Sequence, residues 1–485
     1  MTDLPDLSAV ELLTLYRDRR ASPVEVMTAV LARVEALEPR LNATWALDPD
    51  TALNEARAAE ARWARGAPRG PLDGVPATVK ELIATKGVAK PLGSAATDLT
   101  PEPADAPPAA RLREAGAVIF CKTTSPDFGM LSSGLSSFHK LSRNPWNTDR
   151  TPGGSSAGAG GAAAAGYGPL HLGTDIGGSI RLPAGWCGVY GLKPSNGRVP
   201  IDPPYTGRVA GPMTRTVADS ALMMSVLSAP DWRDHMSLPP ASIAWMDLDI
   251  DPKGLRIGLM LDAGAGARAE PQVVEAVTAA ARLLEAHGAI VEPFAPFLTR
   301  EMLDGLDLFW RVRSWNDISA LPPDKAERVL PYIDAWARAA KDADGLSVYR
   351  GFHQIHRMRE TGTKAFQPFD FVLSPTAPMP AFAAELPSPT NDPARPFEHI
   401  GFTVPFNMTE QPAASINCGY TADGLPIGLQ IVGRRFDDLG VLRLSRLYER
   451  LRPAQRSWPV VERGAPEDPG RGLAHDEAAD GAATG

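Results

Sequence analysis

The spacing of apolar and polar residues predicts helices at the start of the chain. SAVE at 8–11 and SPVE at 22–25 each place a serine three residues before a glutamate, which is the capping-box pattern that begins a helix. In the second, proline takes the first helical position, where its missing N–H costs nothing. The run 50–65 has the apolar period of an amphipathic helix. The N-terminal region is therefore predicted to be helical.

After this region, short apolar runs typical of strands alternate with helical patterns. The predicted strands are GVPATVK ending at Lys80, AVIFCK at 117–122, HLGTDI at 171–176, LRIGLML at 255–261, AIVEPF at 289–294, FDFVLSP at 369–375, PAASINCG at 412–419 and PIGLQIVG at 426–433. The predicted helices lie at 159–166, 271–288 and 437–451. This alternation predicts an α/β fold with a large mixed, mostly parallel central sheet covered by helices on both faces.

Composition and charge exclude several classes of protein. The chain has 485 residues, 44% of them apolar, and a net charge of −8 with no long basic run, so we expect small-molecule partners and no nucleic acid. Cys121, Cys187 and Cys418 are odd in number and far apart, which argues against a disulfide framework. No basic leader precedes an apolar core, and no run reaches the about 18 apolar residues that span a bilayer. We expect a cytoplasmic protein that does not bind membranes.

Familiar catalytic motifs are missing. The GxSxG elbow fails at both Ser155 and Ser179, because the closing glycine is alanine in one case and arginine in the other. There is no GxxxxGK[ST] loop for phosphates. His353 and His356 can share a helical face, but no cysteine or carboxylate set with metal spacing accompanies them. We therefore expect neither a metal nor a cofactor.

Lys80, Ser155 and Ser179 remain as candidates for chemistry. Taken singly, they fit a surface lysine, a loop serine and a turn. Their surroundings, however, contain GPLDGVPATVKE, NPWN, GGSSAG, LGTDIGGSIRLPAGWCGVYGLKPS, GPMTRTVADSA, PFNMTEQPAAS and DGLPIGLQIVGRRFDD in this order. From about residue 8 to 452 the chain resembles the amidase signature family, whose hallmark is a Gly/Ser-rich stretch with a Ser, cis-Ser, Lys triad.

The resemblance implies a role for each of the three residues. Ser179 would be the nucleophile, Ser155 a serine after a cis peptide that relays the proton, and Lys80 the general base. A lysine with a pKa of about 10.4 is neutral in about one molecule in 2,500 at pH 7. Burial must therefore lower the pKa of Lys80 to about 7, an effect worth about 4 kcal/mol. The apolar neighbours Val75, Ala77 and Val79 make such burial plausible.

The glycines before Ser179 leave room for an oxyanion hole. We predict that the backbone N–H groups of Ile176, Gly177, Gly178 and Ser179 converge on the developing oxyanion, where one lost donor typically lowers the rate by a factor of about 10² to 10³. The implied reaction is acyl transfer to Ser179, release of ammonia or an amine, and hydrolysis of the acyl-enzyme without a cofactor.

Other positions near the triad have two interpretations each. Phe128, Met130, Leu131, Gly154, Phe138, Trp310 and Trp315 are candidates for substrate contacts, against ordinary core packing. The resemblance implies hydrogen bonds of Thr174 and Asp175 within the Gly/Ser core, although a local turn explains them equally well. Arg181 is similar to a family position that supports the site by ion pairing. Cys187 fits a small buried residue better than a nucleophile.

The resemblance also sets the expected organisation. We predict a single domain over 1–465, with a signature core at about 65–220 and a variable helical insert at about 295–365. Residues 466–485 offer little to bury and are predicted to be a disordered tail. The aromatic residues Phe309, Trp310, Trp315 and Trp336 of the insert motivate the hypothesis of a wide apolar pocket.

Three functions remain open. The segment TTSPDFGMLSSGLSSFHKLSR at 123–143 departs from the NMDEFAMGSS-like version of the subunit that feeds ammonia to misacylated tRNA, which favours a stand-alone amidase that can also act on esters, anilides or carbamates. The alternatives are the glutaminase subunit of a tRNA-dependent amidotransferase and a catalytically idle binding protein of the same fold. The intact triad disfavours the idle protein. The sequence leaves open which amide is cleaved and whether the chain forms a homodimer.

Overall fold

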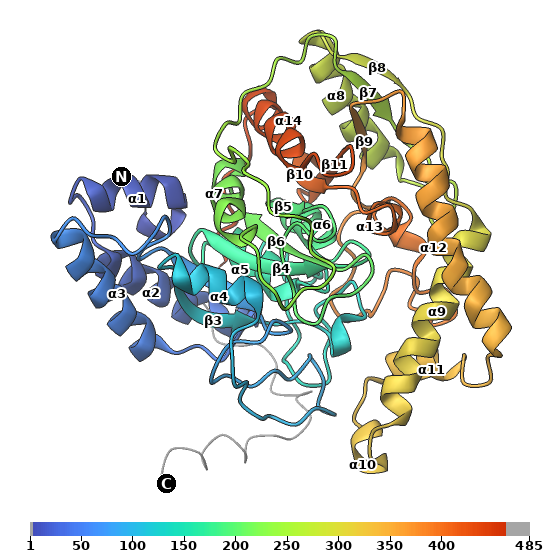
Figure 1. The fold of residues 1–485 in the computed structure, drawn as a ribbon, viewed down its shortest axis with the longest axis horizontal. Helices are drawn as coiled ribbons and strands as arrows, with labels where there is room; N and C mark the ends of the chain where they lie inside the picture. The colour runs from blue at the N-terminus through green and yellow to red at the C-terminus, as the bar shows by residue number, and fades with distance from the viewer. Residues whose placement is uncertain (1–2, 462–485) are drawn as a thin grey trace.

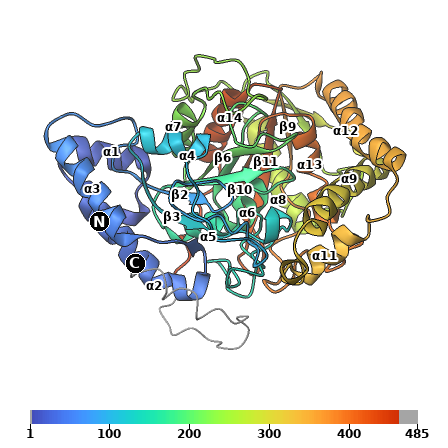
Figure 2. The same ribbon diagram turned by 60° about the horizontal axis from the view of Figure 1, so that its bottom comes forward.

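The computed structural model describes residues 3–461, and its chain begins with the predicted helices. The N-terminal elements are η1 (Leu4–Asp6), α1 (Ala9–Arg17), α2 (Pro23–Leu41) and α3 (Pro49–Ala64). The hydroxyls of Ser8 and Ser22 each accept the N–H of a glutamate three residues on at 3.2 Å, so both capping boxes are confirmed. These helices lie at one end of the molecule in both views (Figures 1 and 2).

The centre of the fold is one sheet of 11 strands in the order β1-β3-β2-β4-β6-β5-β10-β11-β9-β7-β8. The strands are β1 (Thr44–Trp45), β2 (Pro76–Lys80), β3 (Val118–Thr123), β4 (Leu170–Asp175), β5 (Tyr190–Lys193), β6 (Val209–Thr214), β7 (Arg256–Leu259), β8 (Ile290–Pro293), β9 (Phe371–Pro375), β10 (Ala413–Tyr420) and β11 (Pro426–Gly433). All eight predicted strands are present. The prediction did not include β1, β5 and β6.

The prediction of a mixed sheet is confirmed, but the prediction of mostly parallel strands is wrong. The antiparallel pairs are β1–β3, β4–β6, β5–β6, β5–β10, β10–β11 and β9–β11, whereas the parallel pairs are β2–β3, β2–β4, β7–β8 and β7–β9. The physical reason lies in the centre. There β6 inserts between β4 and β5, which run in the same direction, and the short loop 421–425 joins β10 to β11 as a hairpin.

Helices cover both faces of the sheet, as predicted. They include α4 (Pro107–Glu114), α5 (Ala157–Ala165), α6 (Arg181–Cys187), α7 (Val217–Leu227), α8 (Pro271–Ala286) and α14 (Asp438–Leu451). On β11, Gly428 faces Gly185 of α6, whereas Leu429 and Ile431 pack into the core cluster that contains Val441 of α14. Since neighbouring strand residues point to opposite faces, α6 and α14 lie on opposite sides of the sheet. The helix α5 packs beside α6.

The predicted insert is helical. It contains α9 (Arg300–Ser319), α10 (Pro323–Ala326), α11 (Pro331–Arg338) and α12 (Gly345–Phe366), which lie together at the end of the molecule opposite α1 to α3 (Figure 1). Three short elements lie outside the insert along the chain: η2 (Asp127–Gly129) follows β3, and η3 (Glu398–Ile400) and α13 (Val404–Met408) lie between β9 and β10. One apolar cluster joins α9, α11 and α12 to residues of α6, η3 and α13. The insert therefore packs against the helix that follows Ser179.

The domain boundaries remain predictions. A single continuous sheet supports one domain, but its predicted end at 465 and the predicted tail 466–485 lie outside the described residues. Cys121, Cys187 and Cys418 are all unpaired, as expected. No helix within residues 3–461 has the length and apolar character needed to cross a membrane.

Candidate active site

Lys80 and Ser155 are in direct contact. Lys80 is the last residue of β2, is fully buried, and its Nζ donates to the Ser155 Oγ at 2.8 Å and to the Thr174 Oγ1 at 2.9 Å. The peptide bond between Gly154 and Ser155 is cis, as the resemblance implied. A Cβ on Gly154 would lie 2.6 Å from the backbone nitrogen of Ser133, so only glycine fits here.

The surroundings of Lys80 favour the neutral amine. Burial lowers its pKa to about 7, against the opposing charges of Glu81 and Asp175 and with a smaller contribution from the positive charge of Arg208. Among residues 3–461, no carboxylate hydrogen-bonds to the Lys80 amine, whose two partners are hydroxyls. About half of the molecules therefore carry an uncharged amine at neutral pH, which is the state that a general base requires.

Ser156 connects the Ser155 loop to Ser179. The Ser156 N–H donates to the Ser179 carbonyl at 3.1 Å, and its hydroxyl donates to the Thr174 carbonyl at 3.1 Å while accepting the Thr174 N–H at 3.2 Å. Ser179 is half-buried, and within residues 3–461 its hydroxyl forms no hydrogen bond. The structure thus places Ser179 next to the Ser155 loop, whereas the proton relay between the two hydroxyls stays a prediction. The role of Ser156 was not predicted.

The oxyanion hole stays a prediction, but the segment 176–179 shows which of its four backbone N–H groups is already occupied. Within the described part of the chain, the backbone N–H groups of Ile176, Gly177 and Ser179 have no acceptor. The N–H of Gly178 instead donates to the Asp175 Oδ1 at 2.9 Å, so it is already occupied. Gly178 has a φ of +129° and a Cβ on it would lie 2.7 Å from the Thr403 Oγ1, which explains the glycine.

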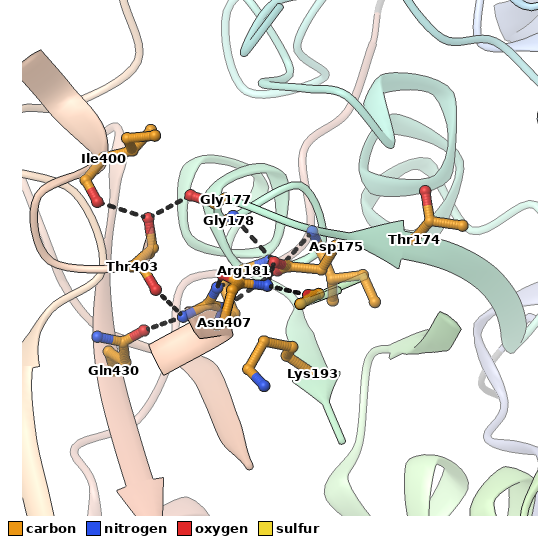
Figure 3. A network of polar contacts seen from close by, with 12 residues as sticks. Thr174, Asp175, Gly177, Gly178, Arg181, Lys193, Ile400, Thr403, Asn407 and Gln430 are labelled. Atoms are coloured by element: carbon orange, nitrogen blue, oxygen red, sulfur yellow. Dashed lines mark hydrogen bonds and ion pairs between the residues drawn. The ribbon is translucent and has the colours of Figure 1, made fainter. Parts of the chain in front are cut away.

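Asp175 and Arg181 hold this segment through a buried ion pair (Figure 3). The Arg181 Nε and Nη2 donate to the two Asp175 oxygens at 3.0 and 2.9 Å, and the carboxylate also accepts the backbone N–H of Ile180 at 3.0 Å. Burial alone would raise the pKa of Asp175, but the charge and hydrogen bonds of Arg181 hold it well below its usual range. The predicted ion pairing of Arg181 and hydrogen bonding of Asp175 and Thr174 are therefore observed.

The C-terminal part of the chain completes this network, which sequence reasoning missed. The Asn407 Nδ2 donates to Asp175 at 2.8 Å, the Gln430 Oε1 accepts from Arg181 at 2.7 Å, and the Thr403 hydroxyl donates to the Gly177 carbonyl at 2.6 Å. Figure 3 shows Gln430 and Thr403 on the side of Arg181 opposite to Asp175, with the Thr403 hydroxyl directed to Gly177 and Ile400. The motifs PFNMTEQPAAS and DGLPIGLQIVGRRFDD contain Asn407 and Gln430 and were the available signals.

Most of the predicted substrate contacts lie in one apolar cluster beside the site. Its members include Phe128, Met130, Leu131, Ile176, Trp310 and Trp315. A Cβ on Gly177 would lie 3.3 Å from the Ile400 side chain and 3.5 Å from the Trp310 ring, so both side chains approach the oxyanion segment. Trp315 is directed to Arg338, whose guanidinium lies 4.8 Å from the ring centroid. This cluster provides the apolar surroundings of the site.

Two further aromatic residues, Phe138 and Trp336, differ in their surroundings. Phe138 is outside this cluster and packs edge-on against Trp45, with ring centroids 5.0 Å apart, because the loop that carries it turns back to β1. Trp336 is in the cluster but is only 2% exposed, and its Nε1 donates to Asp307 at 2.8 Å. Trp336 is therefore a core residue, whereas Phe138 is half-buried beside β1 and its predicted substrate contact stays a prediction.

The alternatives of a thiol nucleophile and a metal site find no support. Burial raises the pKa of Cys187, whose Sγ contacts the Pro152 carbonyl at 3.2 Å. The rings of His353 and His356 lie 5.7 Å apart, and no group of three His, Cys, Asp or Glu side chains that could hold a metal occurs among residues 3–461.

One cavity of the described chain lies away from this site. It has a volume of about 280 Å³ and lies between residues 5–11 and 449–458. None of Lys80, Ser155 and Ser179 lines it. Arg215, which lines it, is paired with Asp6 at 2.7 Å. The buried amine beside a hydroxyl therefore locates the chemistry better than the cavity volume does.

Fold and site define an α/β enzyme of the amidase type, and the comparisons with known proteins agree. Residues 25–442 match the family Amidase. The A-subunit of glutamyl-tRNA(Gln) amidotransferase from Myxococcus xanthus is 35% identical over 92% of this chain and 97% of that protein. A bacterial aryl acylamidase of the amidase signature enzymes has a TM-score of 0.85 at 29% identity, covering 92% of this chain and 96% of its own.

A third similar protein is the 6-aminohexanoate cyclic dimer hydrolase, with a TM-score of 0.84 and 26% identity over 94% of this chain and 98% of its own. The chain therefore belongs to the amidase family and is an amidase signature hydrolase.

Proposed function

We propose that this chain hydrolyses a carboxamide through an acyl-enzyme on Ser179. The contact of the neutral Lys80 amine with the Ser155 hydroxyl at 2.8 Å carries the proposal, because it provides a base and the first half of a relay. Ser155 passes its proton to Lys80 and takes the proton of Ser179, whose oxygen then attacks the amide carbonyl.

The tetrahedral intermediate would be stabilised by the free N–H groups of Ile176, Gly177 and Ser179. Gly178 would not donate to the oxyanion, because its N–H already donates to the Asp175 carboxylate. This hydrogen bond would instead hold the segment in place. The carbon–nitrogen bond then breaks as the proton returns through Ser155 to the leaving amine or ammonia. Water, deprotonated by the same pair, hydrolyses the ester and restores Ser179.

A panel of primary amides, 4-nitroanilides and carbamates tests this reaction. Wild-type protein should release ammonia or 4-nitroaniline from at least one class, and Ser179→Ala should lower kcat by about 10⁴-fold or more, as for nucleophiles in other hydrolases. Ser225→Ala provides the matched control, since this exposed serine lies on α7 away from the site. Activity that survives Ser179→Ala would reject the assigned nucleophile.

Two of the candidate functions, a glutaminase subunit and a stand-alone amidase, have support. The 35% identity over nearly the full length of a glutamyl-tRNA(Gln) amidotransferase chain favours a glutaminase subunit over a stand-alone amidase. The apolar cluster with Trp310 and the higher structural similarity to an aryl acylamidase support a stand-alone enzyme that takes bulky amides.

Activity assays of the purified chain, without any partner, distinguish these two functions. A stand-alone amidase should hydrolyse anilides without any partner and prefer them to glutamine. A glutaminase subunit should act on glutamine and gain activity with the partner chains that co-purify from its source. Preference for acetamide over anilides would argue against the apolar pocket.

A further inference from the structure

Two arginines beside the site have no carboxylate partner. Arg208 precedes β6, and Arg313 lies on α9. Within residues 3–461, neither guanidinium has a carboxylate oxygen within 4.0 Å. By contrast, Arg311 on the same helix pairs with Asp307 at 2.7 Å, and Arg338 on α11 pairs with Asp334 at 2.9 Å. In the same range, Arg328 and Arg350 of the insert also lack an ion pair, but both are exposed, whereas Arg208 and Arg313 are partly buried.

Arg313 also leaves hydrogen-bonding capacity unused. Its guanidinium lies 4.8 Å from the centroid of the Tyr205 ring, and its Nη2 lies 3.7 Å from the Met130 Sδ. Its Nε is buried without an acceptor in the described chain, and the nearby Tyr205 hydroxyl is buried without a partner as well. Buried donors of this kind are rarely left unsatisfied, so an acceptor from outside the chain is expected here.

The two positive charges act on each other. Burial lowers the pKa of Arg208, and the next contribution is repulsion by Arg313, which Tyr205, Asp202 and Asp234 oppose. The Arg208 Nη2 donates to the Pro203 carbonyl, which is neutral. Like charges held together in a half-buried place are costly unless an anion lies between them.

Their position links them to the reaction. The antiparallel β4–β6 register pairs Asp175 with Val209. Arg208 comes one residue before Val209 and therefore lies beside Ile176, the first residue of the oxyanion segment. The charge of Arg208 also contributes to the lowered pKa of Lys80. On the other side, Met130 follows Gly129, on which a Cβ would lie 3.3 Å from the Ser155 Oγ. Arg208, just before β6, and Arg313, on α9, thus approach the Lys80–Ser155 pair from two parts of the fold.

We infer that Arg208 and Arg313, with Tyr205, form a subsite for a carboxylate of the substrate, so that the amide hydrolysed by this chain carries an anionic group. The planar guanidinium and the phenol hydroxyl provide donors that match a carboxylate, whereas the apolar cluster contacts the rest of the molecule. The inference rests on the proposed amide hydrolysis at Ser179. It names the class of substrate as monoamides of dicarboxylic acids or N-acyl derivatives of amino-carboxylates.

Matched pairs of amides test the inference. Glutaramate and valeramide differ only by a carboxylate on the acyl side, whereas 4-acetamidobenzoate and acetanilide differ by one on the amine side. We expect wild-type kcat/KM to favour the carboxylated member of at least one pair by about tenfold or more. Arg313→Met should lower this ratio about tenfold, Arg313→Lys should lower it less, and Arg338→Met on α11 should retain it.

The outcomes separate the inference from the proposed function. Equal rates within both pairs, or a ratio that Arg313→Met leaves unchanged, would overturn the subsite while amide hydrolysis stands. If the wild type hydrolyses none of the four, the proposed reaction fails for these amides, and calorimetric binding decides the subsite. Glutarate or 4-acetamidobenzoate should then bind the wild type about tenfold more tightly than Arg313→Met, and equal binding would overturn the inference. Arg313→Lys takes the place of Arg313→Met if thermal melting shows that the methionine variant is unfolded.

Discussion

At the scale of the residue, the chemistry depends on one amine in an apolar environment. Burial of Lys80 places its pKa at about 7, and only the neutral form can accept a proton. The kcat/KM of the free enzyme should therefore rise about tenfold for each pH unit below 7 and level off above about pH 8. A pH profile measured with a neutral amide checks this. A flat profile between pH 5.5 and pH 8 would contradict the role of Lys80 as the base.

Replacing Gly178 tests whether the conformation of the oxyanion segment depends on its close packing against Thr403. Its φ of +129° is disfavoured for any other residue, and an added Cβ would meet the Thr403 Oγ1 at 2.7 Å. Gly178→Ala should lower the free energy of unfolding by about 1–3 kcal/mol, measured by urea denaturation, and also lower kcat.

Gly254→Ala is the control for this variant. Gly254 also has a positive φ, of +80°, but a Cβ there would have nothing within 4 Å. The control should lose only about 1 kcal/mol, through backbone strain alone, and should retain kcat. Equal losses in both variants would show that the contact with Thr403 has no effect.

At the scale of the element, the ion pair of Asp175 and Arg181 joins the end of β4 to the start of α6 and to β11. Arg181→Met would leave the fully buried Asp175 without a countercharge, a change that typically costs about 3–5 kcal/mol of stability. Urea unfolding measures this loss.

Arg338→Met removes an exposed ion pair with Asp334 and should change the free energy of unfolding by no more than about 1 kcal/mol. A similarly small change for Arg181→Met would show that water or rearrangement compensates the Asp175 charge. The account of a rigid oxyanion segment would then be wrong.

The elements also show what local sequence can predict. The caps at Ser8 and Ser22 and the strand ending at Lys80 depend on neighbours within a few residues, and they were predicted correctly. The antiparallel centre of the sheet depends on β6, which inserts between β4 and β5 and has no periodic pattern of its own. Strand order is set by contacts far apart in sequence, so this part of the topology could not be predicted.

The same limit applies to the site. Lys80, Ser155 and Ser179 were found because motifs surround them, and the ion pairing of Arg181 followed from the same resemblance. Asn407 and Gln430 reach Arg181 from more than 220 residues away, as the separations of 226 and 249 show. Nothing in the local sequence of Arg208 or Arg313 indicates that their charges repel each other, because this interaction depends on the packing of α9 in the folded chain.

At the scale of the whole molecule, three fully or almost fully buried lysines should shape the pH dependence of stability. Burial lowers the pKa of Lys80, Lys122 and Lys193 to about 7 each. In the unfolded chain these pKa values return to about 10.4, so between about pH 7 and 10 the unfolded state binds protons that the folded state lacks. Stability contributed by these groups therefore rises with pH in this window and is at its lowest below pH 7.

Lys193→Met isolates one of these contributions away from the reacting atoms. Lys193 donates to the Pro194 carbonyl at 3.1 Å and lies on β5. Between pH 7 and 8.5, the free energy of unfolding of the wild type should rise with pH more steeply than that of the variant, by about 1.4 kcal/mol per pH unit. Urea denaturation at four pH values measures both slopes, and parallel curves would refute a neutral Lys193.

The most direct test of the account is to trap the acyl-enzyme. An activated ester such as 4-nitrophenyl butyrate, quenched with acid within seconds, should add one butyryl group to the wild-type chain, and peptide mass mapping should locate it on Ser179. Ser179→Ala should carry no adduct, and Lys80→Met should acylate far more slowly. A butyryl group on Ser155 or Cys187, or turnover of amides without any adduct on Ser179, would contradict the account.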